Sequence, residues 1–108
     1  MAREARSHHD LAAALRSRVL ETGRLRRELR VLALEGDGAN APVPYSALIV
    51  QVRDESSRVR DAQVDAVRRA AGSEKETFEL VLAAAIGAGL ERWEVALNVI
   101  REAGDAPS

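Results

Sequence analysis

Cysteine is absent from this 108-residue sequence. That absence excludes a disulfide, a thiolate nucleophile and a thiol-ligated metal site. Aromatic residues are almost as scarce, because there is one Phe, one Tyr and one Trp. A core must therefore be built from Leu, Val, Ile and Ala, and a buried Ala contributes much less apolar area than a Leu. Such a core is small for a single domain, so we expect the chain to gain stability by forming a homo-oligomer.

An excess of charge of one sign is also missing. Sixteen basic residues stand against seventeen acidic ones, which gives a net charge of −1. This balance does not favour binding to nucleic acid or to an anionic membrane. The longest apolar run, Leu80–Leu90, is about half as long as a membrane-spanning helix. The charged first ten residues are unlike a secretion signal. We therefore expect a soluble, cytoplasmic protein without nucleic-acid or membrane partners.

Apolar residues recur along the chain at the spacing of helices, and no stretch alternates at period two as a strand would. The pattern predicts five helices, over residues 11–21, 24–35, 45–57, 62–71 and 74–102. Asp10 and Asp61 are the expected N-caps, and Gly23 and Gly72 the expected C-terminal stops. The chain is predicted to be one all-α domain over residues 1–108, with frayed ends at 1–9 and 104–108.

The fifth predicted helix differs from the others because it is apolar on every side from Leu80 to Leu90. A helix of this kind is typically central and covered on all faces. Two glycines inside it cost roughly 1 kcal/mol each relative to Ala. We expect a second helix to cross closely enough to offset that cost. The candidates for close packing or oligomer contact are Ala83, Gly87, Gly89 and Trp93.

Several features between Val52 and Leu97 occur together in a known group of proteins. They are an Ala-Ala-Gly end to a short helix at Gly72, a Ser-x-x-Glu start at Ser73–Glu76, Phe78–Glu79, the Ala/Gly-rich segment Ala83–Leu90, and Arg92–Glu94. In these features the chain resembles the AhpD-like, or carboxymuconolactone decarboxylase, superfamily. The resemblance implies an AhpD-like domain of about five helices with a long central C-terminal helix. It also implies assembly into a dimer, trimer or hexamer.

The resemblance also points to chemistry that this chain lacks. Peroxidase members carry Cys-x-x-Cys and then His on the helix before the Ala-Ala-Gly turn. Here that helix, Ser57–Ala71, has neither residue, so we do not expect a thiol peroxidase. The leading hypothesis is a non-redox oligomeric scaffold or partner-binding subunit that needs no cofactor. The alternative is a cofactor-free enzyme of the decarboxylase or lyase type acting on a small carboxylate.

Arg92 and Glu79 are the candidate binding residues. Arg92 shares a helical face with Phe78 and Gly89, so we expect its guanidinium to be buried. A buried guanidinium needs a carboxylate, a backbone carbonyl or an anionic ligand, and a structural ion pair is the favoured interpretation. Glu79 is either a general base whose pKa burial raises, or a carboxylate at the rim that pairs with Arg92 through a neighbour.

Three other motifs are interpreted as structural. His8 and His9 lack a third ligand, so we expect no metal site. The arginines of residues 24–30 alternate with glutamates at helical spacing, which predicts a solvated helix face. A helix-turn-helix over residues 64–80 is rejected, because its second helix would present carboxylates to the phosphates of DNA.

Overall fold

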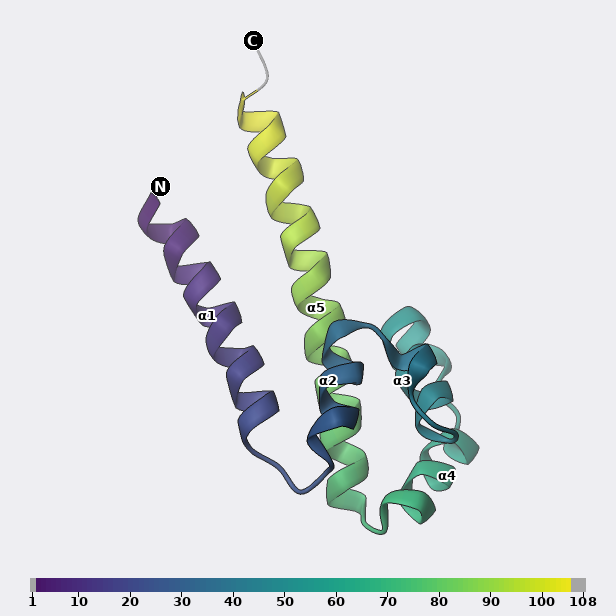
Figure 1. The fold of residues 1–108 in the computed structure, drawn as a ribbon. Coiled ribbons are helices and arrows are strands. Elements are labelled where there is room, and N and C mark those ends of the chain that lie inside the picture. Colours follow the sequence, from purple (N-terminus) through teal and green to yellow (C-terminus); the bar gives the residue numbers. More distant parts are fainter. Residues whose placement is uncertain (1, 106–108) are drawn as a thin grey trace.

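The structure is a computed structural model that describes the backbone of residues 2–105 and the side chains of residues 8–104. This part of the chain is helical and contains no strand, so the predicted all-α fold class is confirmed (Figure 1). The α-helices are α1 (Ala2–Glu21), α2 (Arg27–Glu35), α3 (Tyr45–Glu55), α4 (Asp61–Ala71) and α5 (Glu74–Asp105). Two short 3-10 turns, η1 (Gly38–Asn40) and η2 (Ser56–Arg58), lie on either side of α3.

The predicted boundaries agree with α2 to α5 within three residues, whereas the predicted start of α1 is wrong. Asp10 does not cap this helix, because the helix begins at Ala2 and continues through Asp10. Residues 2–9 contain no Gly or Pro and include several strong helix formers, so nothing in them ends the helix. Met1 and residues 106–108, which belong to the predicted frayed ends, lie outside the described residues.

The hydrophobic core lies where α2 and α3 pack against the first half of α5. Leu48 and Ile49 of α3 and Leu80 of α5 are fully buried there. Ala83 and Ala84 are also fully buried, and their small side chains allow the neighbouring helices to approach α5 closely. The predicted close crossing on α5 is therefore present inside the chain itself.

Gly87 marks the closest approach in this core. A Cβ atom added to Gly87 would overlap both the carbonyl oxygen of Leu34 and the Nη1 atom of Arg53. Arg53 is buried, and its Nη1 donates hydrogen bonds to the carbonyl oxygens of Ala33 (2.8 Å) and Leu34 (3.1 Å). The last carbonyls of a helix have no partner within it, so Arg53 caps the C-terminal end of α2. Its Nη2 also pairs with the carboxylate of Glu91 on α5.

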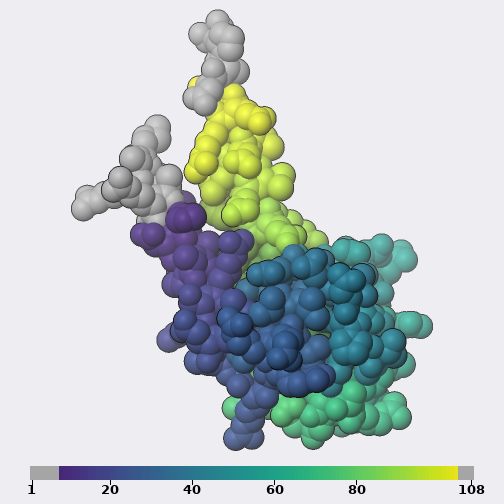
Figure 2. Space-filling view, in the orientation of Figure 1, coloured from purple at the N-terminus to yellow at the C-terminus, as the bar shows by residue number. Residues whose placement is uncertain are grey.

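The second half of α5 extends beyond the core, and α1 runs antiparallel beside it (Figure 1). Figure 2 shows the end of α5, in yellow, projecting past the rounded body formed by α2 to α4. The molecule measures 56 × 27 × 20 Å, and its radius of gyration is 16.1 Å. A compact domain of this length would have a radius of gyration of about 13 Å.

The prediction that α5 is covered on all faces is wrong for this single chain. Leu82, inside the apolar segment Leu80–Leu90, is 42 % exposed, and Phe78 just before that segment is 63 % exposed. The helices α1 and α4 only flank this side, since Leu82 lines a hollow with α1 and Phe78 lines one with α4. One apolar face of the longest helix is therefore only partly covered by the described residues.

The two glycines of α5 should respond in opposite ways to alanine. We expect Gly87→Ala to destabilise the chain by about 1–3 kcal/mol, because the new methyl group meets backbone that cannot move aside. We expect Gly89→Ala to stabilise it by about 0.5–1 kcal/mol, because a Cβ there meets nothing and Ala is the better helix former. Urea unfolding at a concentration too low for association measures both. Equal effects would contradict the packing described for Gly87.

Candidate functional site

Arg30 is a charged residue that the fold turns inward. It lies on α2, and only 6 % of its surface is exposed. Its Nη1 donates hydrogen bonds to the carbonyl oxygens of Val19 (2.9 Å) and Thr22 (2.8 Å), so it caps the C-terminal end of α1. The predicted solvated face is therefore wrong at this position. Arg30 precedes the buried Ala33 and Leu34 by three and four residues, and this spacing was the signal that it shares their face.

Glu79 holds the turn that connects α1 to α2. Its carboxylate accepts hydrogen bonds from the backbone N–H of Arg24 (2.9 Å to Oε2) and of Leu25 (2.8 Å to Oε2). Burial acts to raise the pKa of Glu79, but these bonds and the positive charges of Arg30 and Lys75 outweigh it, and the pKa lies below the usual 4.5. The raised pKa that the general-base alternative requires is therefore contradicted. Glu79 is an ionised acceptor already occupied by the backbone.

Arg30 and Glu79 line the same cavity, which opens between the lower ends of α1 and α5. Its volume is about 260 Å³. Most of its wall is apolar. The lining residues are Leu15, Arg18, Val19 and Thr22 from α1, Arg30 from α2, and Glu79, Leu82, Ala83 and Ile86 from α5. We call it the Arg30 cavity. The Nε atom of Arg30 is buried and has no hydrogen-bond partner.

Arg92, the other candidate binding residue, lies away from this cavity. It is thirteen residues beyond Glu79 on α5, which corresponds to about 20 Å along a helix, so the structure does not bring the two together. The prediction that Arg92 is buried is wrong, because its side chain is exposed. Its Nη2 donates a hydrogen bond to the carbonyl oxygen of Arg53 at 2.6 Å. A backbone carbonyl was one of the predicted kinds of partner.

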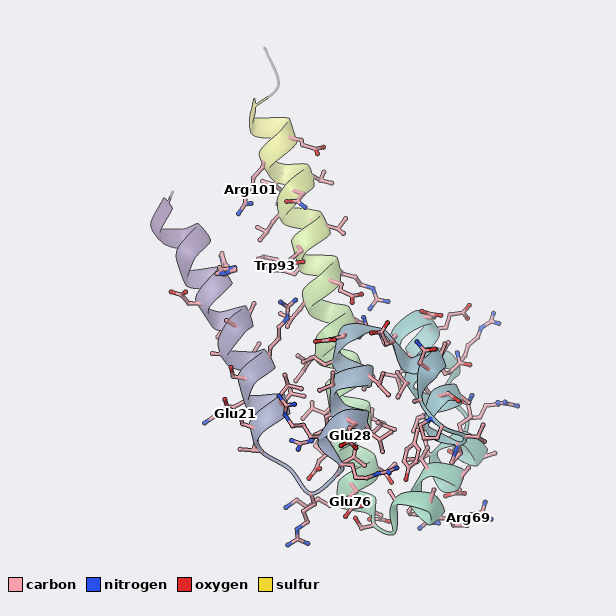
Figure 3. All side chains as sticks on the ribbon, viewed as in Figure 1. Glu21, Glu28, Arg69, Glu76, Trp93 and Arg101 are labelled. Atoms are coloured by element: carbon pink, nitrogen blue, oxygen red, sulfur yellow. The ribbon has the colours of Figure 1, made fainter. Side chains whose placement is uncertain are left out.

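The four close-packing candidates divide into two pairs. Ala83 and Gly87 are buried against other parts of the same chain, whereas Gly89 and Trp93 are exposed. Trp93 points from α5 toward α1, where the ring of His8 meets it edge-on with centroids 5.3 Å apart (Figure 3). Sequence reasoning did not predict this aromatic pair. No cluster of three or more metal-ligating side chains occurs among the described residues 8–104.

An apolar stripe runs along the open side of α5. Its members are Phe78, Leu82, Ala85, Gly89, Trp93, Ala96 and Ile100, and all seven are exposed. The spacing is four, three and four residues, repeated twice, which makes an 11-residue period. We call these seven residues the α5 stripe. The exposed Leu11 and Leu15 of α1 line a surface hollow together with Trp93, so the apolar surface continues onto α1.

Comparisons of the chain with protein-family models, with curated proteins and with solved structures find no match. The described helices include none with the length and apolar character needed to cross a membrane. The function must therefore be inferred from two features of the chain itself, the α5 stripe and the Arg30 cavity.

The lowered pKa of Glu79 predicts a specific dependence of stability on pH. A carboxylate with a lowered folded-state pKa stabilises the fold above its unfolded pKa, and this contribution is lost as the pH falls through the folded value. We expect Glu79→Gln to be less stable than the unmodified chain at pH 7. We also expect it to lose less stability as the pH falls below about 4.5. Urea midpoints measured from pH 3 to pH 7 test this.

Glu102→Gln is the matched control, because it removes an exposed carboxylate from the same helix. We expect its midpoints to follow those of the unmodified chain. Parallel curves for Glu79→Gln and the unmodified chain would show that the Glu79 carboxylate does not stabilise the α1–α2 turn.

Proposed function

We propose that the chain is a self-associating helical subunit, a non-redox relative of the AhpD-like group that acts as a scaffold for its own copies or for a protein partner. The α5 stripe carries this proposal. All seven of its members are exposed, and the described helices only flank it, where Trp93 meets His8 of α1 and Leu82 lines the Arg30 cavity. Exposed apolar surfaces of this kind mark sites of association.

The period of the stripe suits packing along the whole helix. An 11-residue repeat corresponds to about 3.67 residues per turn, close to the 3.6 of an α-helix, so the stripe stays on one side of a nearly straight helix. Its small members, Ala85, Gly89 and Ala96, allow a second helix to approach closely. Its large members, Phe78, Leu82, Trp93 and Ile100, supply apolar area. Two copies packed through their stripes and their α1 helices would form a four-helix arrangement.

The apolar face is long enough for two helices to associate. The stripe runs from Phe78 to Ile100, about 33 Å along α5, and at a width of about 10 Å it presents roughly 330 Å². Leu11 and Leu15 of α1 extend this apolar surface. A typical stable interface buries roughly 800 Å² on each partner, so the interface would also include the polar residues that flank the stripe.

The charges of α5 leave the stripe free. Glu91 and Glu94 lie on the opposite side of the helix from Gly89 and Ala96, as their spacing requires. Arg92 lies at the edge of the stripe, and it already donates to the carbonyl of Arg53. Covering the stripe with a second copy would therefore keep both carboxylates out of the interface and leave Arg92 at its rim, where the charge can stay in contact with solvent.

The enzyme alternative has less support. It assigns a substrate carboxylate to Arg92, but Arg92 is exposed and is bonded to the backbone of Arg53. Glu79, the candidate general base, has a pKa that is lowered and not raised, and both hydrogen-bond donors facing it are backbone groups of Arg24 and Leu25. A decarboxylase or lyase needs a group that can exchange a proton near neutral pH.

A pair of substitutions on α5 tests the proposed association. Ile100 and Val95 are both 63 % exposed, but they point in directions about 140° apart, and only Ile100 belongs to the stripe. We expect the unmodified chain and Val95→Glu to be dimers or larger by light scattering at micromolar concentration. We expect Ile100→Glu to be a monomer, because its charge would be buried in the interface.

A monomeric unmodified chain would overturn the proposal. Dissociation of Val95→Glu to the same extent as Ile100→Glu would place the interface elsewhere on α5. Circular dichroism of both variants should show unchanged helix content, since both positions face solvent in the single chain.

A further inference from the structure

We propose that the Arg30 cavity binds a small monocarboxylate with an apolar body. The carboxylate lies against the guanidinium of Arg30, and the body packs against Leu15, Leu82 and Ile86. The cavity is formed within one chain, so this inference does not need the proposed association. Leu82 also belongs to the α5 stripe and Leu15 to the apolar surface beside it, so association through that face would cover part of the cavity wall.

The buried guanidinium of Arg30 points to an acidic ligand. Both of its hydrogen bonds within the chain use Nη1, and its Nε has no partner. A buried donor on a charged group without an acceptor is unfavourable. Because Nε itself has almost no accessible surface, an oxygen of the ligand would reach it only after the Arg30 side chain turns toward the cavity that it lines, and that bond would relieve the cost. Carboxylates match the planar edge of a guanidinium and can accept two parallel hydrogen bonds from it. The cavity wall around Arg30 includes Leu15 and Leu82, which are partly exposed.

The charges around the cavity favour a single negative charge. Arg18 lines the cavity from α1, so two guanidinium groups face one carboxylate, that of Glu79. Glu79 does not neutralise Arg30 by direct contact, because its oxygens accept the backbone N–H groups of Arg24 and Leu25. The site therefore carries a net charge of about one positive unit. A doubly charged phosphate would exceed that charge and would lack apolar contacts.

The walls and size of the cavity favour a short apolar body. Leu15, Val19, Leu82, Ala83 and Ile86 contribute aliphatic carbon on both sides. The volume of about 260 Å³ is below the roughly 300–1,000 Å³ of sites for drug-sized ligands. A compound of the size of hexanoate fits this description. The remaining alternative occupant is a side chain of a second copy, and the experiment separates the two.

The test titrates the unmodified chain with three probes: hexanoate, 1-hexanol and inorganic phosphate. Heteronuclear NMR follows the side-chain Nε–H of Arg30 and the amides that line the cavity. We expect saturable shifts at these groups with hexanoate. We expect binding at least tenfold weaker for hexanol, which lacks the charge, and for phosphate, which lacks the apolar body. Equal binding of hexanoate and hexanol would overturn the assignment of Arg30, and no saturation with hexanoate would overturn the site.

Two variants locate the binding. Arg30→Met removes the guanidinium and should weaken hexanoate binding at least tenfold. Arg27→Met, an exposed arginine on the same helix, is its matched control and should bind as the unmodified chain does. Arg30→Met also removes the cap on α1, so its thermal melting is measured in parallel.

Ile86→Trp tests whether hexanoate binds in the Arg30 cavity if Arg30→Met fails to fold. Ile86 is half-buried on the cavity wall, and the larger ring would fill the cavity without removing any charge. We expect a folded protein that no longer binds hexanoate, and binding at unmodified affinity would contradict the site. Ile100→Glu should bind hexanoate normally as a monomer. Loss of binding in Ile100→Glu would show that a second copy completes the cavity. Binding seen in Ile100→Glu but not in the unmodified chain would show that a second copy fills it, so the two proposals can fail separately.

Discussion

The position of α5 depends on one contact, the guanidinium of Arg53 beside the bare backbone of Gly87. Arg53 comes from α3, caps the last carbonyls of α2, and pairs with Glu91 of α5, so one side chain joins three helices. It can do so because Gly87 leaves room for Nη1 and for the carbonyl of Leu34. That contact sets the distance between α2 and α5, and α1 then packs against both.

Arg30 repeats this arrangement one helix earlier. Each of these two arginines donates two hydrogen bonds from Nη1 to the final carbonyls of the preceding helix, where a positive charge also interacts favourably with the helix dipole. The difference lies in the remaining donors. Arg53 has Glu91 as a direct partner, whereas Arg30 keeps an unpartnered Nε beside an apolar cavity. The two arginines thus cap helices in the same way, but only Arg30 keeps a hydrogen-bond donor without a partner in the chain.

Helical periodicity was enough to predict the all-α fold and most helix boundaries, because both depend on the spacing of apolar residues along the sequence. Periodicity could not distinguish Gly87 from Gly89, because both lie in the same Ala/Gly-rich segment. Only the close approach of α2 to Gly87 requires a glycine at that position. Arg30 was predicted to be solvated because glutamates alternate with the arginines of residues 24–30 at helical spacing, and its inward direction depends on where α1 ends. Arg92 was predicted to be buried because its face is apolar, but the described helices leave Arg92 on that face exposed.

The length of α5 gives a single helix two different environments. Its first half is fixed by α2, α3 and α4, while its last turns, from Val95 onward, are mostly exposed. Amide hydrogens in the first half can exchange with solvent only when the whole core opens, whereas those in the last turns exchange through local fraying. The exchange rate should therefore change steeply along one uninterrupted helix, close to the position where Arg92 is bonded to Arg53.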